Sequence, residues 1–197
     1  MFTKLVPNIT LPLRTGVEDR LRVMGEAIDY DPSSGQKATA SPIWTLTFPH
    51  GENVIDVLSP TTGPIASFGK VLGDRTTLYK YLNPRLTTVL TADPERRICG
   101  LYVVDGTKGT TVYHTEIKQS FSGCNIKTLL VENWLIYHYF ESEVPGGTAG
   151  GAKGWRMASI EFYEGQKVDE KIRRYASGSL WEKRSLNGLQ LGTFFVL

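Results

Sequence analysis

The chain has 197 residues, of which 41% are hydrophobic and 21% are charged, and its formal net charge is +2. This length suffices to bury a sizeable core, and the composition excludes both an intrinsically disordered protein and a bundle of membrane spans. Because the basic residues are few and scattered among acidic ones, no nucleic-acid partner is expected.

The sequence contains few features that indicate a cellular compartment. Residues 1–20 lack the apolar core of a signal peptide, and no stretch reaches the ~18 apolar residues that a transmembrane helix needs. Taken alone, these features predict a soluble, cytosolic protein. Asn8-Ile9-Thr10 is an N-glycosylation triplet, which makes Asn8 a candidate modification site. The two cysteines, Cys99 and Cys124, either form one disulfide or stay reduced, and their positions do not decide between the two states.

The N-terminal region has two readings. Residues 15–18 fit a helix capping box, and the apolar residues that follow fall on one helical face. These apolar residues are Val17, Leu21, Met24 and Ile28. Residues 22–30 are equally compatible with a strand, so both alternatives stay open.

The rest of the chain is dominated by β signals. Short runs rich in β-branched and aromatic residues are separated by clusters of Gly, Pro, Asn and Asp. These runs are residues 43–48, 53–58, 86–91, 97–105, 110–118, 126–131, 134–140 and 155–163. Since no helical stretch lies between them, the sequence predicts an antiparallel all-β fold with little helix.

A hairpin pattern occurs twice. Ile28-Asp29 leads through Gly35 to Ile43-Trp44, and Val104-Asp105 leads through Gly109 to Val112-Tyr113. In each, Asp is expected to accept hydrogen bonds from turn N–H groups, Gly to adopt positive φ, and the aromatic residue to pack across the sheet. Repeated hairpins of this kind are typical of β-propeller blades.

Motifs for catalysis or cofactor binding are not found. Residues 146–154 are glycine-rich, but Ala152 stands where a phosphate-binding loop needs Lys, so a flexible hairpin loop is expected. The three histidines lack metal-ligand spacing, and the nucleophile motif Gly-x-Ser-x-Gly is absent. We therefore expect a protein that is not an enzyme, with no catalytic, cofactor-binding or metal-binding residue and no cofactor.

Residues 69–84 form the most distinctive segment. A Gly-Asp turn, in which Asp74 and Arg75 are expected to brace the chain, precedes the triplet Tyr79-Lys80-Tyr81 and an Asn-Pro turn. In an extended run, Tyr79 and Tyr81 share one face and Lys80 points to the other. Two interpretations stay open for these five residues: a partner-docking surface, since Tyr and Arg are common interface anchors, or a loop that locks neighbouring blades.

Four segments in the same order resemble the family of subunit 1 of the ER membrane protein complex. They are 71–84 (Val-Leu-Gly-Asp-Arg followed by Leu-Tyr-Lys-Tyr-Leu-Asn-Pro), 100–109, 131–139 and 160–165. The resemblance covers about residues 43–165. It implies antiparallel β-propeller blades forming part of a propeller from the C-terminal luminal region, and a scaffold role without known catalytic residues in an insertase for transmembrane segments.

The resemblance also sets the expected organisation. Residues 1–42 are a possible partial blade or short helix, 43–165 are propeller blades, and 166–197 diverge and are expected to be loop or irregular. The family carries a signal peptide and one transmembrane helix, so this chain is expected to be a fragment. It implies the luminal side of the ER membrane, the other subunits of the complex as partners, and membrane association only through parts missing from this chain.

Two other functions compete with the scaffold role. The Asp-turn-Gly-aromatic hairpins are also compatible with a fragment of a quinone-dependent propeller enzyme. Open strand edges would also suit a soluble β-domain that binds a peptide by strand addition.

Overall fold

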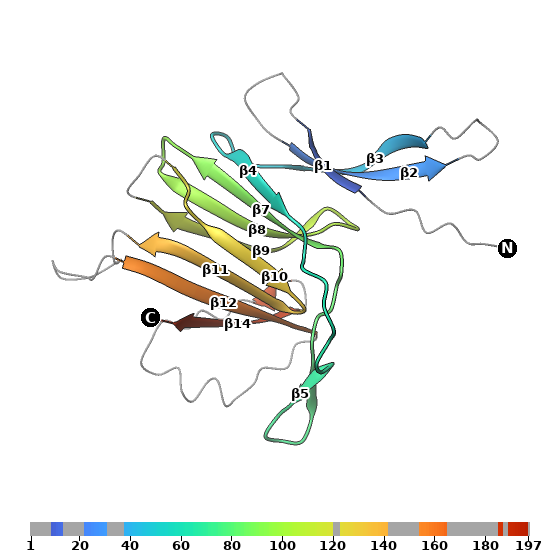
Figure 1. The fold of residues 1–197 in the computed structure, drawn as a ribbon, viewed down its shortest axis with the longest axis vertical. Coiled ribbons are helices and arrows are strands. Elements are labelled where there is room, and N and C mark those ends of the chain that lie inside the picture. Colours follow the sequence, from blue (N-terminus) through green and yellow to red (C-terminus); the bar gives the residue numbers. More distant parts are fainter. Residues whose placement is uncertain are drawn as a thin grey trace. The chain divides into compact units, whose positions relative to one another are not determined.

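A computed structural model describes residues 9–13, 22–30, 38–119, 123–141, 154–164, 185–186 and 189–196. All regular secondary structure within these residues consists of β-strands, and the sheets are antiparallel (Figure 1). This confirms the expected all-β fold class. The chain divides into two compact units, Met1–Val57 with Arg85–Ile117 and Leu58–Pro84 with Lys118–Leu197.

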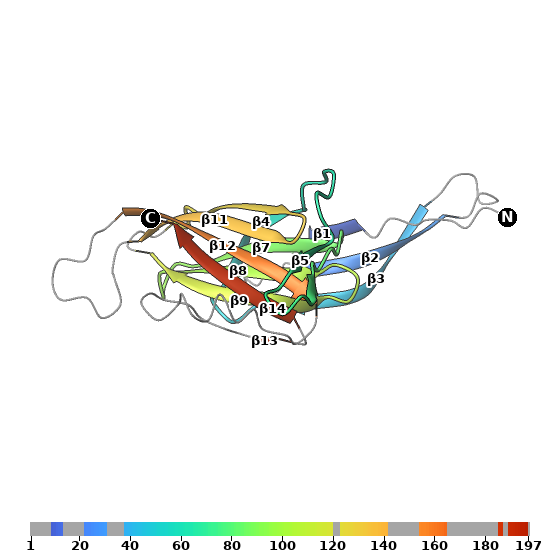
Figure 2. The same cartoon turned by 90° about the horizontal axis from the view of Figure 1, so that it is seen from below.

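The first unit contains a four-stranded sheet with the order β4-β7-β8-β9 (Figures 1 and 2). Its strands are β4 (Asn53–Leu58), β7 (Leu86–Asp93), β8 (Ile98–Asp105) and β9 (Thr110–Lys118). Every residue of β8 is buried, and so are all residues of β7 except Ala92. The two central strands therefore have both faces covered, and β8 is accordingly apolar along most of its length.

A second sheet of this unit is a meander with the order β1-β2-β3. Its strands are β1 (Ile9–Leu13), β2 (Arg22–Tyr30) and β3 (Ala38–Thr47), and a register shift falls between Gly25 and Glu26. Val23 of β2 is fully buried and packs in one cluster with Phe48, Val89 and Tyr102. Because Arg22–Tyr30 is a strand, the helical alternative is wrong for residues 22–28; the capping-box residues 15–18 lie outside the described residues.

The predicted second hairpin is confirmed at the turn from β8 to β9. The Asp105 carboxylate accepts a hydrogen bond from the Thr107 N–H at 2.8 Å, and Gly109 adopts φ of +70°. Trp44 of β3 lies against this turn, and its indole Nε1–H donates to the Gly106 carbonyl at 3.0 Å. The turn of the first predicted hairpin, residues 31–37, lies outside the described residues.

The second unit contains a five-stranded sheet with the order β10-β11-β12-β14-β13. Its strands are β10 (Lys127–Val131), β11 (Trp134–Glu141), β12 (Gly154–Glu164), β13 (Ser185–Leu186) and β14 (Leu189–Val196). Buried side chains on one face include Leu130, Leu135 and Ile160. A separate hairpin pairs β5 (Gly69–Val71) with β6 (Thr77–Tyr79).

Strand positions agree closely with the predicted runs, and β4 and β9 match them at both ends. β11 and β12 pair antiparallel, as expected for strands joined by a hairpin, although the glycine-rich stretch itself falls largely outside the described residues. The expectation of a loop or irregular tail over 166–197 is wrong for β13 and β14, because β14 pairs with β12 over eight residues. The residues of the tail alone do not indicate this pairing, because the partner strand β12 ends 25 residues before β14 begins.

Candidate docking site around Tyr79, Lys80 and Tyr81

The site begins with the hairpin of β5 and β6, whose turn is closed by Asp74. The Asp74 carboxylate accepts hydrogen bonds from the backbone N–H and the hydroxyl of Thr76, at 2.9 and 2.6 Å. Arg75 adopts φ of 68°, and its N–H donates to the Leu72 carbonyl at 3.1 Å. An Asx-type turn of this kind stabilises the left-handed conformation that Arg75 must adopt. Asp74 therefore braces the turn, as the sequence predicted.

Lys80 follows β6 and fastens the segment to the turn between β10 and β11. Its Nζ lies 2.6 Å from Oε2 of Glu132, and the two side chains are only 14% and 18% exposed. The backbone of Lys80 also donates to the Phe68 carbonyl at 3.0 Å and forms an antiparallel bridge with Tyr163 of β12. Because water screens this ion pair less than one at the surface, it restrains the segment more effectively.

The carboxylate of Glu132 accepts the hydrogen bonds that hold this segment. Glu132 lies in the two-residue turn that joins β10 to β11 and adopts φ of 50°. Its Oε1 accepts a second hydrogen bond, from the N–H of Ala66, at 3.4 Å. The hydrogen bond from Lys80, and secondarily that from Ala66, hold the pKa of the Glu132 carboxyl below its usual value. One carboxylate thus contacts the segment at two points.

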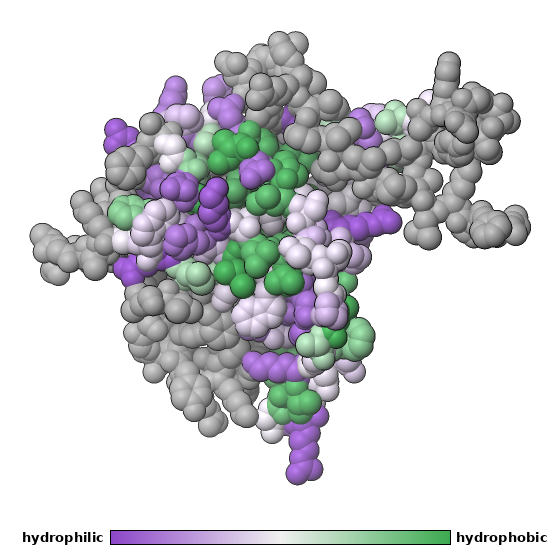
Figure 3. Space-filling model, viewed as in Figure 1, coloured by the Kyte–Doolittle hydropathy of each residue, from purple (hydrophilic) through white to green (hydrophobic). Residues whose placement is uncertain are grey.

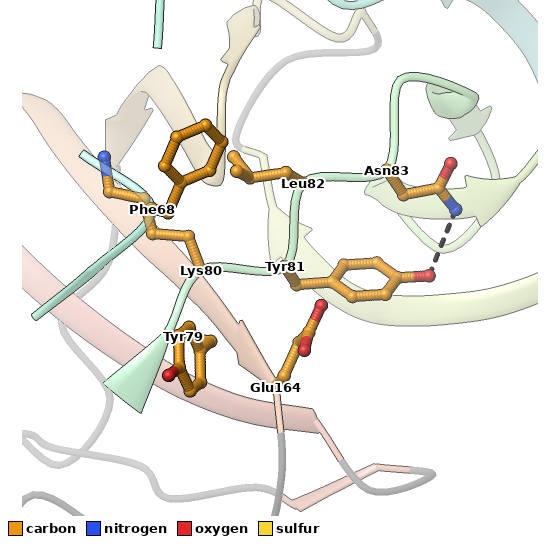
Figure 4. A pocket seen from close by; sticks show the side chains of 7 residues that line it. All are labelled: Phe68, Tyr79, Lys80, Tyr81, Leu82, Asn83 and Glu164. Carbon is orange, nitrogen blue, oxygen red and sulfur yellow. Dashed lines mark hydrogen bonds between the residues drawn. The ribbon is translucent and has the colours of Figure 1, made fainter. Parts of the chain in front are cut away.

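The two tyrosines of the triplet have different environments. The N–H of Tyr81 donates to the Phe162 carbonyl of β12 at 3.0 Å, and its phenol oxygen accepts a hydrogen bond from the Asn83 amide at 3.1 Å. Tyr79, in contrast, is 58% exposed. Figure 4 shows the Lys80 side chain extending away from both tyrosine rings, as expected for alternating residues. Tyr81 is therefore held against the sheet, whereas Tyr79 faces solvent.

A pocket of about 280 Å³ lies beside the triplet. Its lining consists of Phe68, Tyr79, Lys80, Tyr81, Leu82, Asn83 and Glu164, shown in Figure 4. Aromatic and aliphatic groups form most of the wall, although Phe68 is 69% exposed. On the face drawn in Figure 3, green apolar areas lie among pale and purple residues.

The predicted site residues thus come together only in part. Lys80, Tyr79 and Tyr81 line one pocket, whereas Asp74 and Arg75 lie at the tip of the hairpin and do not line it. Asn8, the predicted glycosylation site, lies outside the described residues. Three further residues of the site, Glu132, Phe68 and Glu164, were not predicted, because only the folded chain places them beside the triplet.

A second feature that the sequence did not predict is a buried carboxylate in the first unit. Glu52 is 1% exposed, and its Oε2 accepts hydrogen bonds from the hydroxyls of Thr91 at 2.6 Å and Tyr102 at 2.8 Å. Burial, and then the contact with Glu52, raise the pKa of Tyr102 far above its ordinary value. The Tyr102 ring also stacks on His114, with centroids 4.1 Å apart. These contacts form a polar cluster within an otherwise apolar region.

The remaining features concern the cysteines, metal binding and membrane-spanning helices. Both cysteines, Cys99 and Cys124, are disulfide-bonded. Within the described residues, no group of three or more His, Cys, Asp and Glu side chains is placed to hold a metal ion. The same part of the chain contains no helix with the length and apolar character of a membrane span.

Comparison with known proteins identifies the family. A family model described as "ER membrane protein complex subunit 1, second beta-propeller" matches residues 4–191. The match extends on both sides beyond the 43–165 range suggested by the four ordered segments.

Curated relatives agree with this match. Subunit 1 of the ER membrane protein complex from Xenopus laevis is 32% identical over 129 residues, which cover 62% of this chain and 12% of that protein. The corresponding protein of Schizosaccharomyces pombe is 32% identical over 130 residues, covering 66% and 14%, and that of Saccharomyces cerevisiae is 27% identical over 136 residues, covering 68% and 17%. The matched part thus spans less than a fifth of each relative. The chain belongs to the family of subunit 1 of the ER membrane protein complex, in the part described as its second β-propeller.

Proposed function

We propose that this chain is a non-catalytic scaffold part of the ER membrane protein complex, exposed to the ER lumen, and that it supports insertion of transmembrane segments. The observation that carries this proposal is the family match over residues 4–191. The partners are then the other subunits of the complex, and association with the membrane runs through parts of the protein other than this chain.

The state of the cysteines supports the luminal side. Both Cys99 and Cys124 are disulfide-bonded, and disulfides persist in oxidising compartments such as the ER lumen but are rare in the cytosol. The triplet at Asn8 is compatible with the same compartment. The test is alkylation of the cysteines with a maleimide reagent in freshly quenched cells. Labelling that requires prior reduction supports the luminal assignment, and labelling without reduction argues for a cytosolic location.

The segment around Tyr79 supports a role in docking. Lys80 and Tyr81 fasten this segment to the sheet of its own unit, whereas Tyr79 and Phe68 remain largely exposed beside the pocket. Exposed aromatic residues on a restrained backbone are typical anchors of protein interfaces, because little conformational entropy is lost when a partner binds. We therefore assign Tyr79 and Phe68 to partner docking, and Lys80 and Tyr81 to holding the segment on its own sheet.

Co-purification tests the proposed function. The gene product is tagged at its own locus, membranes are solubilised in a mild detergent, and bound proteins are identified by mass spectrometry. The expected result is recovery of the other subunits of the complex. Recovery of a soluble species without them contradicts the scaffold role and favours an independent peptide-binding β-domain.

A further inference from the structure

We propose that the pocket bounded by Phe68, Tyr79, Tyr81 and Glu164 receives the side chain of an arginine or lysine from a partner protein. The inference rests on the proposed docking function and adds the chemistry of the group that is recognised. Three properties of the pocket support it: its aromatic walls, its charge and its restrained backbone.

The walls offer aromatic faces to a cation. Phe68 and Tyr79 are 69% and 58% exposed, so their rings are accessible at the mouth of the pocket, and Tyr81 lines it from the opposite side in Figure 4. An ammonium or guanidinium group is attracted to the face of such rings, while its aliphatic stem packs against apolar groups such as Leu82. Neutral apolar side chains would gain only the packing against apolar groups and not the attraction of a cation to the rings.

The charges around the pocket leave one carboxylate available to a cation. Lys80 and Glu164 are the charged residues of its lining, and the Lys80 ammonium is already paired with Glu132 at 2.6 Å. The carboxylate of Glu164 is exposed, and no ion pair or hydrogen bond joins it to another described side chain. Figure 4 shows it next to the Tyr81 ring, directed toward the pocket. An incoming cation therefore meets the Glu164 carboxylate, whereas an anion finds only an ammonium that Glu132 already neutralises.

Size and rigidity favour a single side chain on a docked segment. The volume of about 280 Å³ lies just below the ~300–1,000 Å³ that is usual for cofactor and small-ligand sites. The backbone at 80 and 81 is fixed by hydrogen bonds to Phe68 and Phe162, so the pocket is preformed. Preformed pockets that hold one anchor residue are the common arrangement at protein interfaces.

The test is site-specific crosslinking in the full-length protein within its complex. Tyr79 is replaced by p-benzoylphenylalanine, which retains an aromatic ring, the complex is irradiated, and the crosslinked peptide is sequenced by mass spectrometry. We expect a peptide of another subunit with Arg or Lys at or next to the crosslinked position. A crosslinked peptide without a basic residue there, or an intact complex without any crosslink, overturns the proposal.

Charge variants provide the second readout. In the protein that carries p-benzoylphenylalanine in place of Tyr79, Glu164→Lys is expected to lower the crosslinking yield about tenfold. Glu164→Gln is expected to lower it less, because like charges oppose docking more strongly than a neutral amide does. Glu95→Gln, an exposed carboxylate outside the pocket, is the matched control and should leave the yield unchanged. Reversing the charge of the crosslinked partner residue should restore the yield with Glu164→Lys; failure of this rescue contradicts a direct pair.

The two proposals fail in distinguishable ways. If the other subunits co-purify but the crosslink or the charge variants behave otherwise, only the cation pocket is wrong. If the subunits do not co-purify with the unmodified protein, the scaffold function itself is wrong.

Discussion

The Lys80 ammonium and the Glu132 carboxylate lie 2.6 Å apart, although 52 residues separate them along the chain. The pair joins the segment after β6 to the turn between β10 and β11, within one unit. Since Glu132 also accepts from the N–H of Ala66, loss of its carboxylate should weaken the contacts at both ends of the exposed region that includes Phe68 and Tyr79, whereas loss of the Lys80 ammonium removes only one of them.

Removing the pair should loosen residues 66–83. Lys80→Met retains most of the aliphatic stem but removes the ammonium, and Glu132→Gln removes the carboxylate charge. Both variants should increase hydrogen exchange of this segment in the full-length protein, and the double variant should add little to either one, because the residues act as a pair. Glu95→Gln serves as a control with unchanged exchange. Additive effects of the two substitutions would show that the pair is not coupled.

The contribution of Glu132 should depend on pH. Its folded-state pKa is lowered, first by the hydrogen bond from Lys80, so its contribution to stability is present above the ordinary Glu pKa of about 4.3 and is lost as pH falls through the lowered value. The difference in melting temperature between the unmodified protein and Glu132→Gln should therefore be constant near pH 7 and vanish in acid. A difference that persists at pH 2 would contradict this assignment.

Gly109 should not tolerate a side chain. Its φ of +70° disfavours any L-residue, and a Cβ at this position would lie 2.5 Å from the Trp44 ring. Gly109→Ala should lower the free energy of unfolding by about 1–3 kcal/mol, measured by denaturant titration. Gly63→Ala is the matched control, because no atom lies within 4 Å of its added Cβ. Equal effects of the two substitutions would count against the packing described for Trp44.

Loss of the Tyr102 hydroxyl should destabilise the first unit. Tyr102→Phe removes one donor to the buried Glu52 carboxylate and should cost about 1–3 kcal/mol of unfolding free energy near pH 7. Tyr79→Phe, at an exposed position, is the control.

The phenol of Tyr102 should ionise at a higher pH than an exposed tyrosine does. Burial raises the folded-state pKa of Tyr102, so its contribution to stability is full below pH ~10 and is lost as pH rises toward the folded-state value. Stability should thus fall in alkali for the unmodified protein and fall less for Tyr102→Phe. An absorbance titration in which all tyrosines of the folded protein ionise near pH 10 would contradict the buried contact.

The sequence by itself determined the elements that depend on neighbouring residues. The runs at 53–58 and 110–118 are the strands β4 and β9, because β-branched and aromatic residues between turn-forming residues favour extended structure over short distances. The turn at Asp105 and Gly109 was predictable for the same reason: a carboxylate that accepts from the turn N–H groups and a residue tolerating positive φ lie within five positions. The order of four segments also indicated the family.

Only the tertiary structure decided which distant residues meet. Nothing near Lys80 in the sequence indicates Glu132, nothing near Glu52 indicates Tyr102, and nothing in residues 189–196 indicates pairing with β12. The early strand at 22–30 likewise depends on its partner β3, since its local pattern fits a helix equally well. Local propensities act over a few residues, whereas ion pairs, buried hydrogen bonds and strand pairing depend on the path of the whole chain, which brings these groups together.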